Sequence, residues 1–477
     1  MGADAKSSTT MKVVKIVVPA VVGIIIGLLP VPEGLTVEAM RFIGIFAAVI
    51  LWLVVDAMPT FIAVILGMAL CVFCGVAKYT VAFSGMASST VWTIIGVFGF
   101  AAVISESGLL RRVALIVLSK FPENYTGQIG GIMTTGLVIS PLIPSTTAKT
   151  AILTPFAMDV AKAFGYAKNG KGITGIFCAA YIASQYLGSA FLSGSLLVFL
   201  ILGFVPSEIA AEFTWMQWFL ACVVWLVVLF VLSYLAIVFL YNPKKDAASH
   251  DAENIEKGTT KRKLEELGPL SHNEKIAIGF LAVAFLGWTV GSYFDIDAGI
   301  WAILLWGIMI VTGYFKPADF VTKIGWPIVF FVGGILSLAS MISSLGISAW
   351  LAPIVAPYLA PITVNPYVFI AALCILTYIV RLVIVSQAAT VAIFTAALGG
   401  VATVMGISPW VVAFVCYMST LVWHFNFSST QYMTTMGLTK GEMTTHAKTM
   451  PMNFAYMAIN LIACVASVPL WQAMGLM

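Results

Sequence analysis

The sequence predicts an all-α membrane protein that crosses the bilayer many times. Of its 477 residues, 61% are hydrophobic and only 9% are charged, whereas about a quarter of the residues in an average soluble domain carry charge. Apolar runs of membrane-spanning length recur along nearly the whole chain. The net charge of +4 does not indicate a nucleic-acid partner, because the basic residues lie in loops between apolar runs rather than on one soluble face.

Eleven apolar runs are predicted to cross the membrane as helices. The first follows a polar segment, residues 1–12, which we expect in the cytoplasm. A polar segment of nearly balanced charge, residues 242–274, is expected to be a cytoplasmic linker between a first half (13–241) and a second half (275–477). The predicted spans are residues 13–29, 42–55, 60–76, 91–107, 173–204, 215–241, 276–293, 300–314, 327–345, 409–436 and 454–474.

Two further apolar stretches, residues 127–163 and 367–404, are too long for one crossing of about 20 residues. Polar clusters interrupt both of them near the middle, at Pro144–Lys149 and at Val385–Thr390. Lipid tolerates such groups at mid-depth only where protein or a water-filled cavity surrounds them. Each stretch is therefore predicted to be a re-entrant helical hairpin, which returns to the side from which it entered.

The distribution of basic residues supports this layout. With the N-terminus inside, the C-terminus outside and both hairpins returning, all but four of the 24 Lys and Arg residues fall in cytoplasmic segments or at their edges, as the positive-inside rule requires. The exceptions are Arg41, Lys78, Lys149 and Arg381. A hairpin that crossed completely would place every later basic loop on the wrong side.

The two halves share one order of elements, in which a span is followed by a hairpin and then by a span with a polar interruption. The interruptions are residues 189–195 and 426–431. Because the first hairpin enters from inside and the second from outside, the halves are predicted to be an inverted repeat. Inverted repeats with broken helices are typical of secondary transporters.

The polar clusters predict a binding site for an anion with two charged ends. A hairpin that turns within the membrane leaves unpaired N–H groups at the start of its second helix, and these groups attract anions together with the helix dipole. The two hairpins would present such starts from opposite sides. The candidate binding residues are Ser145, Thr146, Thr147, Lys149, Ser189, Ser193, Gly194, Arg381, Ser386, Gln387, Ser428, Ser429 and Thr430.

Lys149 and Arg381 sharpen this prediction, because a cation within an apolar hairpin costs a few kcal/mol unless an anion or a water pocket receives it. Either cation could bind the substrate directly, or it could replace a bound sodium ion and so favour exchange over symport. Arg381 could instead be a structural ion-pair partner, and His424 a structural histidine.

Pro144–Lys149, the cluster at Ser386 and the segment Trp52–Pro59 resemble the divalent-anion/sodium symporter family of di- and tricarboxylate carriers. The likeness covers almost the whole chain. It implies eleven spans and two hairpins, divided between a scaffold domain, which usually holds a homodimer, and a transport domain that moves like an elevator.

The chain departs from this family's pattern at both hairpin tips. The family's signature there is Ser-Asn-Thr, whereas this sequence has Ser145-Thr146-Thr147 and Ser386-Gln387-Ala388. The first tip, with Lys149 after it, is similar to the family's exchanger branch. That branch often has a histidine where this chain has Thr390, so Arg381 or His424 would have to compensate.

These observations predict a carrier of small organic anions, with di- or tricarboxylates as the expected substrates, that works by sodium-independent exchange in a cell inner membrane. One alternative is sodium-coupled symport, with Ser145 and Thr146 in the cation site. Another is a cation or proton antiporter or a metalloid pump on a related fold, although neither hairpin tip has a nearby carboxylate. No enzymatic activity, cofactor, other metal site or nucleic-acid partner is expected. The expected partners are the anion, the lipid bilayer and a second copy of the chain.

Overall fold

The computed structural model describes residues 2–195, 197–243, 258–290, 298–347, 349–351, 353–354 and 365–477, and in these ranges all regular secondary structure is helical. The all-α prediction is thus confirmed for the described part of the chain. The α-helices are α1 (Gly2–Gly27), α2 (Val37–Val54), α3 (Thr60–Phe73), α4 (Tyr79–Ala82), α5 (Ser89–Glu106), α6 (Leu109–Ser119), α7 (Tyr125–Ile139), α8 (Thr146–Ala163), α9 (Lys171–Gln185), α10 (Val198–Phe204), α11 (Ser207–Glu212), α12 (Trp215–Leu240), α13 (Thr259–Glu266), α14 (His272–Val290), α15 (Ala298–Val311), α16 (Pro317–Thr322), α17 (Trp326–Ser344), α19 (Pro366–Val380), α20 (Gln387–Val404), α21 (Pro409–Thr420), α22 (Thr430–Leu438) and α23 (His446–Ala473).

Among the described residues, α2, α5, α12 and α23 are long and apolar enough to cross a membrane by themselves. The predicted spans at 173–204 and 409–436 are each divided into shorter pieces. The first consists of α9, a 3-10 turn at Leu187–Ala190 and α10, and the second of α21, a 3-10 turn at Asn426–Ser428 and α22. The breaks fall at the polar interruptions.

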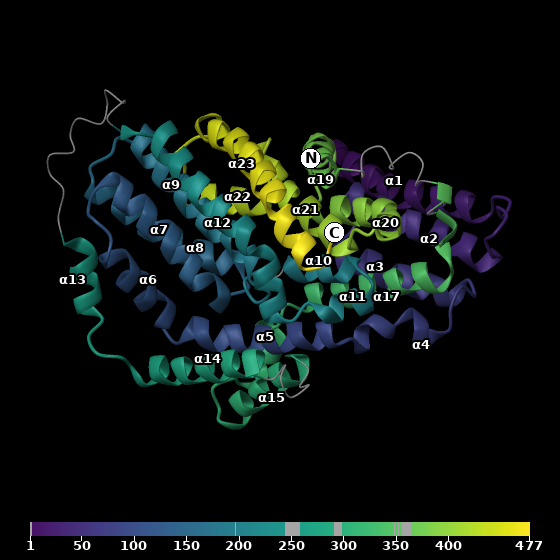
Figure 1. The fold of residues 1–477 in the computed structure, drawn as a ribbon, viewed down its shortest axis with the longest axis horizontal. Helices are drawn as coiled ribbons and strands as arrows, with labels where there is room; N and C mark the ends of the chain where they lie inside the picture. Colours follow the sequence, from purple (N-terminus) through teal and green to yellow (C-terminus); the bar gives the residue numbers. More distant parts are fainter. Residues whose placement is uncertain are drawn as a thin grey trace.

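One end of the molecule is built on α1, α2, α3 and α17, which pack together (Figure 1). Glycines allow α1 and α2 to approach closely. A Cβ added to Gly23 would lie 2.6 Å from the carbonyl oxygen of Gly44, and one added to Gly44 would lie 2.7 Å from the backbone nitrogen of Gly27. Since Cβ atoms essentially never come so near to backbone, larger residues would force these helices apart.

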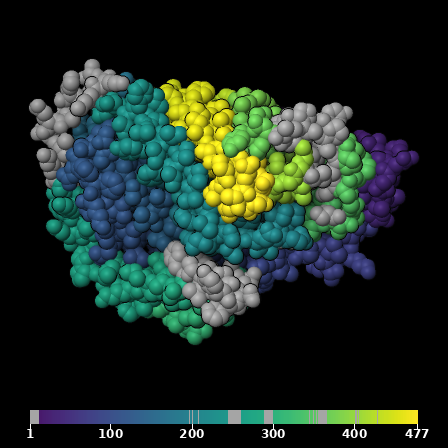
Figure 2. Space-filling view, viewed as in Figure 1, coloured from purple at the N-terminus to yellow at the C-terminus, as the bar shows by residue number. Residues whose placement is uncertain are grey.

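The other end contains α6 to α9, and the helices α12, α21, α22 and α23 lie between the two ends (Figure 1). Helices α12 and α23 pack along each other and join the two halves of the sequence. The Trp225 indole donates a hydrogen bond to Asn460 Oδ1 at 2.9 Å, and the Trp471 indole donates one to the carbonyl of Ala221 at 2.8 Å. In the view of Figure 2, α23 (yellow) separates the blue first-half helices from the purple N-terminal ones.

The two predicted hairpin regions each form two α-helices joined by a short connection, which in the first region includes a 3-10 turn at Ser140–Leu142. Helices α7 and α8 are joined through residues 140–145, and α19 and α20 through residues 381–386. The connections coincide with the polar clusters, because Pro141 and Pro144 interrupt the first stretch and the unwound residues 384–386 interrupt the second. We propose that both hairpins re-enter the membrane and that the two halves are an inverted repeat.

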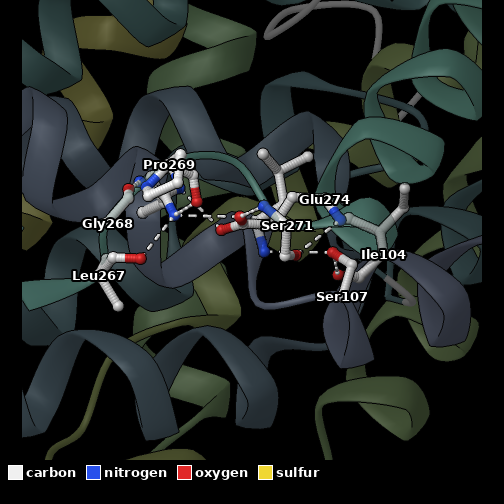
Figure 3. Close-up of polar contacts among 9 residues, drawn as sticks. Ile104, Ser107, Leu267, Gly268, Pro269, Ser271 and Glu274 are labelled. Carbon is white, nitrogen blue, oxygen red and sulfur yellow. Dashed lines mark hydrogen bonds and ion pairs between the residues drawn. The ribbon is translucent and has the colours of Figure 1, made fainter.

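The linker is more ordered at its C-terminal end than its composition indicates. Residues 244–257 lie outside the described part, but α13 follows and the chain then continues into α14. The guanidinium of Arg112 on α6 binds both carboxylate oxygens of Glu274 at 2.8 and 3.0 Å, and it also donates to three linker carbonyls. Figure 3 shows these carbonyls, of Leu267, Gly268 and Pro269, beside Glu274. We call this group the linker clamp.

Candidate functional site

The connection in the first hairpin ends at Ser145, the N-cap of α8. Its hydroxyl oxygen accepts a hydrogen bond from the backbone N–H of Ala148 at 3.2 Å. Thr146 and Thr147 occupy the first turn, where backbone N–H groups have no partner within the helix. This is the helix start at which the sequence analysis predicted anion binding.

Lys149 lies one turn into α8 and is completely buried. Its ammonium donates a hydrogen bond to the carbonyl of Gly194 at 2.7 Å. Gly194 belongs to the break between α9 and α10, and Gly188 on the opposite side of this break is so close that a Cβ there would collide with the ammonium and with the Gly194 carbonyl. Lys149 therefore ties the first hairpin to the broken span that follows it.

Two serines strengthen the same junction. Ser193 donates to the carbonyl of Pro141 at 2.7 Å and accepts from the Trp215 indole at 3.0 Å. The carbonyl of Ser189 accepts from the Trp218 indole at 3.0 Å. These contacts hold the α9–α10 break against the hairpin on one side and against α12 on the other.

The second hairpin repeats this arrangement. Ser386 precedes α20, and its hydroxyl oxygen accepts from the N–H of Ala389 at 3.2 Å. Arg381, only 1% exposed, donates to the carbonyls of Ile384 and Val385 in its own hairpin and to that of Ser428 at 2.6 Å. Ser428 belongs to the break between α21 and α22. Each hairpin is thus joined to the next broken span by a buried cation that donates to a backbone carbonyl.

The break between α21 and α22 ends at Ser429, which caps α22 by accepting from the N–H of Tyr432 at 3.2 Å. The Ser429 hydroxyl lies 3.4 Å from the Tyr181 hydroxyl of α9. His424 lies within this break, and its Nδ1 is 3.3 Å from the side-chain nitrogen of Asn453. Helix α9 of the first half therefore contacts the break of the second half through Tyr181 and Ser429.

Two cavities adjoin these groups. The larger, of about 640 Å³, is lined by Ser386, Gln387, Ser428, Ser429 and Thr430. The smaller, of about 10 Å³, is lined by Thr146 of the first hairpin and by Gln387 and Ser429 of the second half, and it is large enough for roughly one water molecule. Because Gln387 and Ser429 border both cavities, the two form one polar region between the hairpin tips.

The predicted site residues thus divide into two sets. Six of them line a cavity, namely Thr146, Ser386, Gln387, Ser428, Ser429 and Thr430. The other seven, Ser145, Thr147, Lys149, Ser189, Ser193, Gly194 and Arg381, are not part of either lining. Five of these, Lys149, Ser189, Ser193, Gly194 and Arg381, take part in the contacts that hold the breaks. Lys149 and Arg381 are buried and line neither cavity, so a direct bond from either cation to a substrate would require a rearrangement.

The sequence analysis missed several residues that line the same cavities. Tyr181, Gln185 and Gln431 border the smaller cavity, and Lys15 and Asp56 border the larger. Gln431 directly follows a predicted residue, so proximity to the polar interruption was the available signal. Nothing in the sequence pattern distinguishes Tyr181, because it lies among packing aromatics.

The comparison with known families decides where this architecture belongs. The family described as "Sodium:sulfate symporter transmembrane region" matches residues 10–475. This chain belongs to that family. The resemblance inferred from the hairpin tips is thereby confirmed, and the chain is an integral, multi-pass membrane protein of a transporter family.

Relatives of this family member are about a quarter identical to it over the residues that align. The putative malate transporter YflS of Bacillus subtilis is 26% identical, over 73% of this chain and 73% of its own length. The L-tartrate/succinate antiporter of Escherichia coli strain K12 is 24% identical, over 76% and 78%. The chloroplastic dicarboxylate transporter 1 of Arabidopsis thaliana is 25% identical, over 84% and 72%.

Solved structures with a similar fold include two bacterial membrane proteins. The YdaH transporter of Alcanivorax borkumensis gives a TM-score of 0.55 at 16% identity and covers 98% of both chains. MtrF of Neisseria gonorrhoeae gives 0.54 at 14% identity, covering 97% of this chain and 94% of its own. At these identities the likeness concerns the fold alone.

Proposed function

We propose that this family member exchanges small organic dianions, di- or tricarboxylates, across the membrane without sodium. The observation that carries the proposal is the pair of buried cations, Lys149 and Arg381, each of which donates to a carbonyl in a broken span. A bound sodium ion would use such carbonyls as ligands. Fixed side chains that bind these oxygens remove the need for an external cation.

Exchange follows from the cost of leaving these charges without a partner. Lys149 is fully buried and Arg381 almost so, and a buried positive charge is costly unless an anion or hydrogen bonds offset it. A dianion at the hairpin tips would offset the positive charge, and the loaded protein could change conformation more easily than the empty one. The relatives named as a malate transporter and a tartrate/succinate antiporter support carboxylates as the substrate class.

We further propose an elevator mechanism for this exchange. The cavity that holds Ser386 and Ser428 also borders α1, α3 and α17, so it lies where a moving domain would slide along a fixed one. In this proposal α1 to α5, α14, α15 and α17 form the scaffold, through which two copies form a dimer. The hairpins, the broken spans, α12 and α23 form the transport domain. The N-terminus is cytoplasmic and the C-terminus external, in the inner membrane of the cell.

The test is uptake of labelled succinate or citrate into proteoliposomes, with and without unlabelled internal anion, in sodium and in potassium. Exchange predicts uptake that requires internal anion and is the same in both salts. Uptake that requires sodium but no internal anion would instead establish symport, the alternative that the family description favours. Ser386→Ala should weaken uptake through the loss of a cavity hydroxyl and helix cap. Ser119→Ala, at the end of α6 and outside both cavity linings, is the matched control.

A further inference from the structure

The larger cavity has two different walls. One is the polar wall of the second hairpin and the α21–α22 break. The other comes from α1, the turn between α2 and α3, and the start of α17, which contribute Lys15, Asp56, Thr60 and Pro327. Among the described residues of the lining, Lys15 and Asp56 carry the only charges. Asp56, Thr60 and Pro327 lie at a turn or at helix starts, whereas Lys15 lies within α1.

Lys15 is held on a rigid element. The neighbouring carbonyl, of Ile16, accepts a hydrogen bond from the Trp52 indole at 2.9 Å, and further along the pair Gly23 and Gly44 bring the helices into contact. Lys12, almost one turn earlier, is exposed and does not line the cavity. The two lysines therefore provide a matched pair, one facing the cavity and one outside it.

Asp56 occupies the turn that ends α2. Its φ is +50°, and the N–H of Ala57 donates to the carbonyl of Trp52 at 3.0 Å, five residues back. This is the hydrogen bond of a Schellman motif, whose left-handed position usually holds glycine or asparagine. Replacing Asp56 by asparagine would therefore remove the charge while keeping the turn.

We propose that Lys15 and Asp56 form a charge-balanced wall that controls how anions pass between this cavity and the water at the N-terminal face. Lys15 raises the local concentration of anions, since low-dielectric walls focus its field. Asp56 opposes this attraction, so that the anion is not retained when it has to leave. That the anion is a dicarboxylate rests on the proposed function, and the wall itself does not.

The reaction rate of a cysteine placed at Thr60 with charged reagents reports the electrostatic effect of the wall, and this measurement requires no transport. The Thr60→Cys protein is treated with a negatively charged and with a positively charged methanethiosulfonate reagent. Proteins that have Thr60 but are otherwise identical give the contribution of the native thiols. At low ionic strength we expect Lys15→Gln to slow the anionic reagent about threefold to tenfold, less than the effect of a whole charged cleft. Asp56→Asn should accelerate it by a similar factor, and both changes should reverse sign with the cationic reagent.

High salt and Lys12 supply the controls. At roughly 0.5 M salt, where the screening length falls to a few ångströms, the differences should shrink. Lys12→Gln should leave both reagents unaffected. Equal rates in all variants, or an effect of Lys12→Gln as large as that of Lys15→Gln, would overturn the proposal.

Transport kinetics then distinguish this proposal from the proposed function. In exchange assays, Lys15→Gln should raise the KM for succinate on the side of the N-terminus about threefold or more. The KM on the opposite side should stay unchanged. Protease access to an N-terminal tag gives the orientation of the protein in the vesicles. Equal changes on both sides would contradict a wall on one face. If the Thr60→Cys variants show the expected reagent effects but the wild-type protein carries no carboxylate, the proposed function is refuted and the wall is kept.

Discussion

Lys149→Met is expected to weaken anion binding while the protein still folds. Methionine keeps most of the side-chain volume but removes the donor that binds the Gly194 carbonyl at 2.7 Å. A hydrogen bond to a charged group contributes about 1.5–3 kcal/mol. If the α9–α10 break must hold this geometry for the tip to bind an anion, the lost bond converts to an affinity reduction of about 10- to 150-fold.

The fall in overall stability should be smaller than this loss at the site. A buried ammonium carries a desolvation cost, and an apolar replacement of similar volume removes that cost. The Gly194 carbonyl then lacks its partner, which costs about 1–3 kcal/mol, so the two effects partly cancel. We therefore expect a modest change in the melting temperature of the anion-free protein.

The assay is a thermal-shift titration with succinate, malate and citrate, followed by exchange in proteoliposomes. Lys162→Met is the matched control, because Lys162 is an exposed lysine on the same helix. It should retain both the anion-induced shift and the exchange rate. If Lys149→Met also retained both at the wild-type level, the cation would have no role in binding, and the reasoning for sodium-independent exchange would fail.

Three further predictions concern other contacts. Gly188→Ala should reproduce the binding loss of Lys149→Met, because the new Cβ collides with the ammonium; normal succinate titration of this variant would contradict the observed packing. Arg381→Lys should reduce exchange at least tenfold, since one ammonium cannot reach the three carbonyls that the guanidinium binds, and unchanged exchange would show that its charge alone suffices. The Arg112 guanidinium, through its hydrogen bonds, holds the pKa of Glu274 below the usual value of 4.5, as do the hydrogen bonds from Ser271. The linker clamp is therefore intact at neutral pH and weakens as the pH falls below about 4.5 through the pKa of the folded state. Glu274→Gln should loosen it at every pH, which faster tryptic cleavage within α13 at neutral pH would detect; an unchanged cleavage rate would show that the clamp does not order the linker.

Much of the fold could be predicted because membrane helices leave a local signal. Lipid requires every backbone polar group to be satisfied within its own helix, so each helix appears in the sequence as an apolar run. The breaks at 189–195 and 426–431 were visible for the same reason, as polar residues within such runs. Helix α13 was not expected, because the linker segment that contains it is held by α6, which is distant in sequence.

The candidate site was predicted in outline but not in detail. The capping serines, Ser145 and Ser386, occupy helix starts because proline and short polar residues end one helix and begin another. The groups that the two buried cations bind could not be predicted. Lys149 and Arg381 bond to Gly194 and Ser428, each about 45 residues further along the chain, and only tertiary packing brings these carbonyls to them.

The sequence by itself determined that this protein is a helical membrane carrier with two polar breaks in each half, because hydrophobicity and helix breaking act over a few neighbouring residues. Only the tertiary structure decided which polar groups face a cavity and which bind protein carbonyls. That choice depends on distances between segments such as α1, α17 and the second hairpin, and such distances leave no trace in local composition. Lys15 and Asp56 illustrate the difference, since they lie at the ends of ordinary apolar runs and acquire a shared environment only when these helices pack around one cavity.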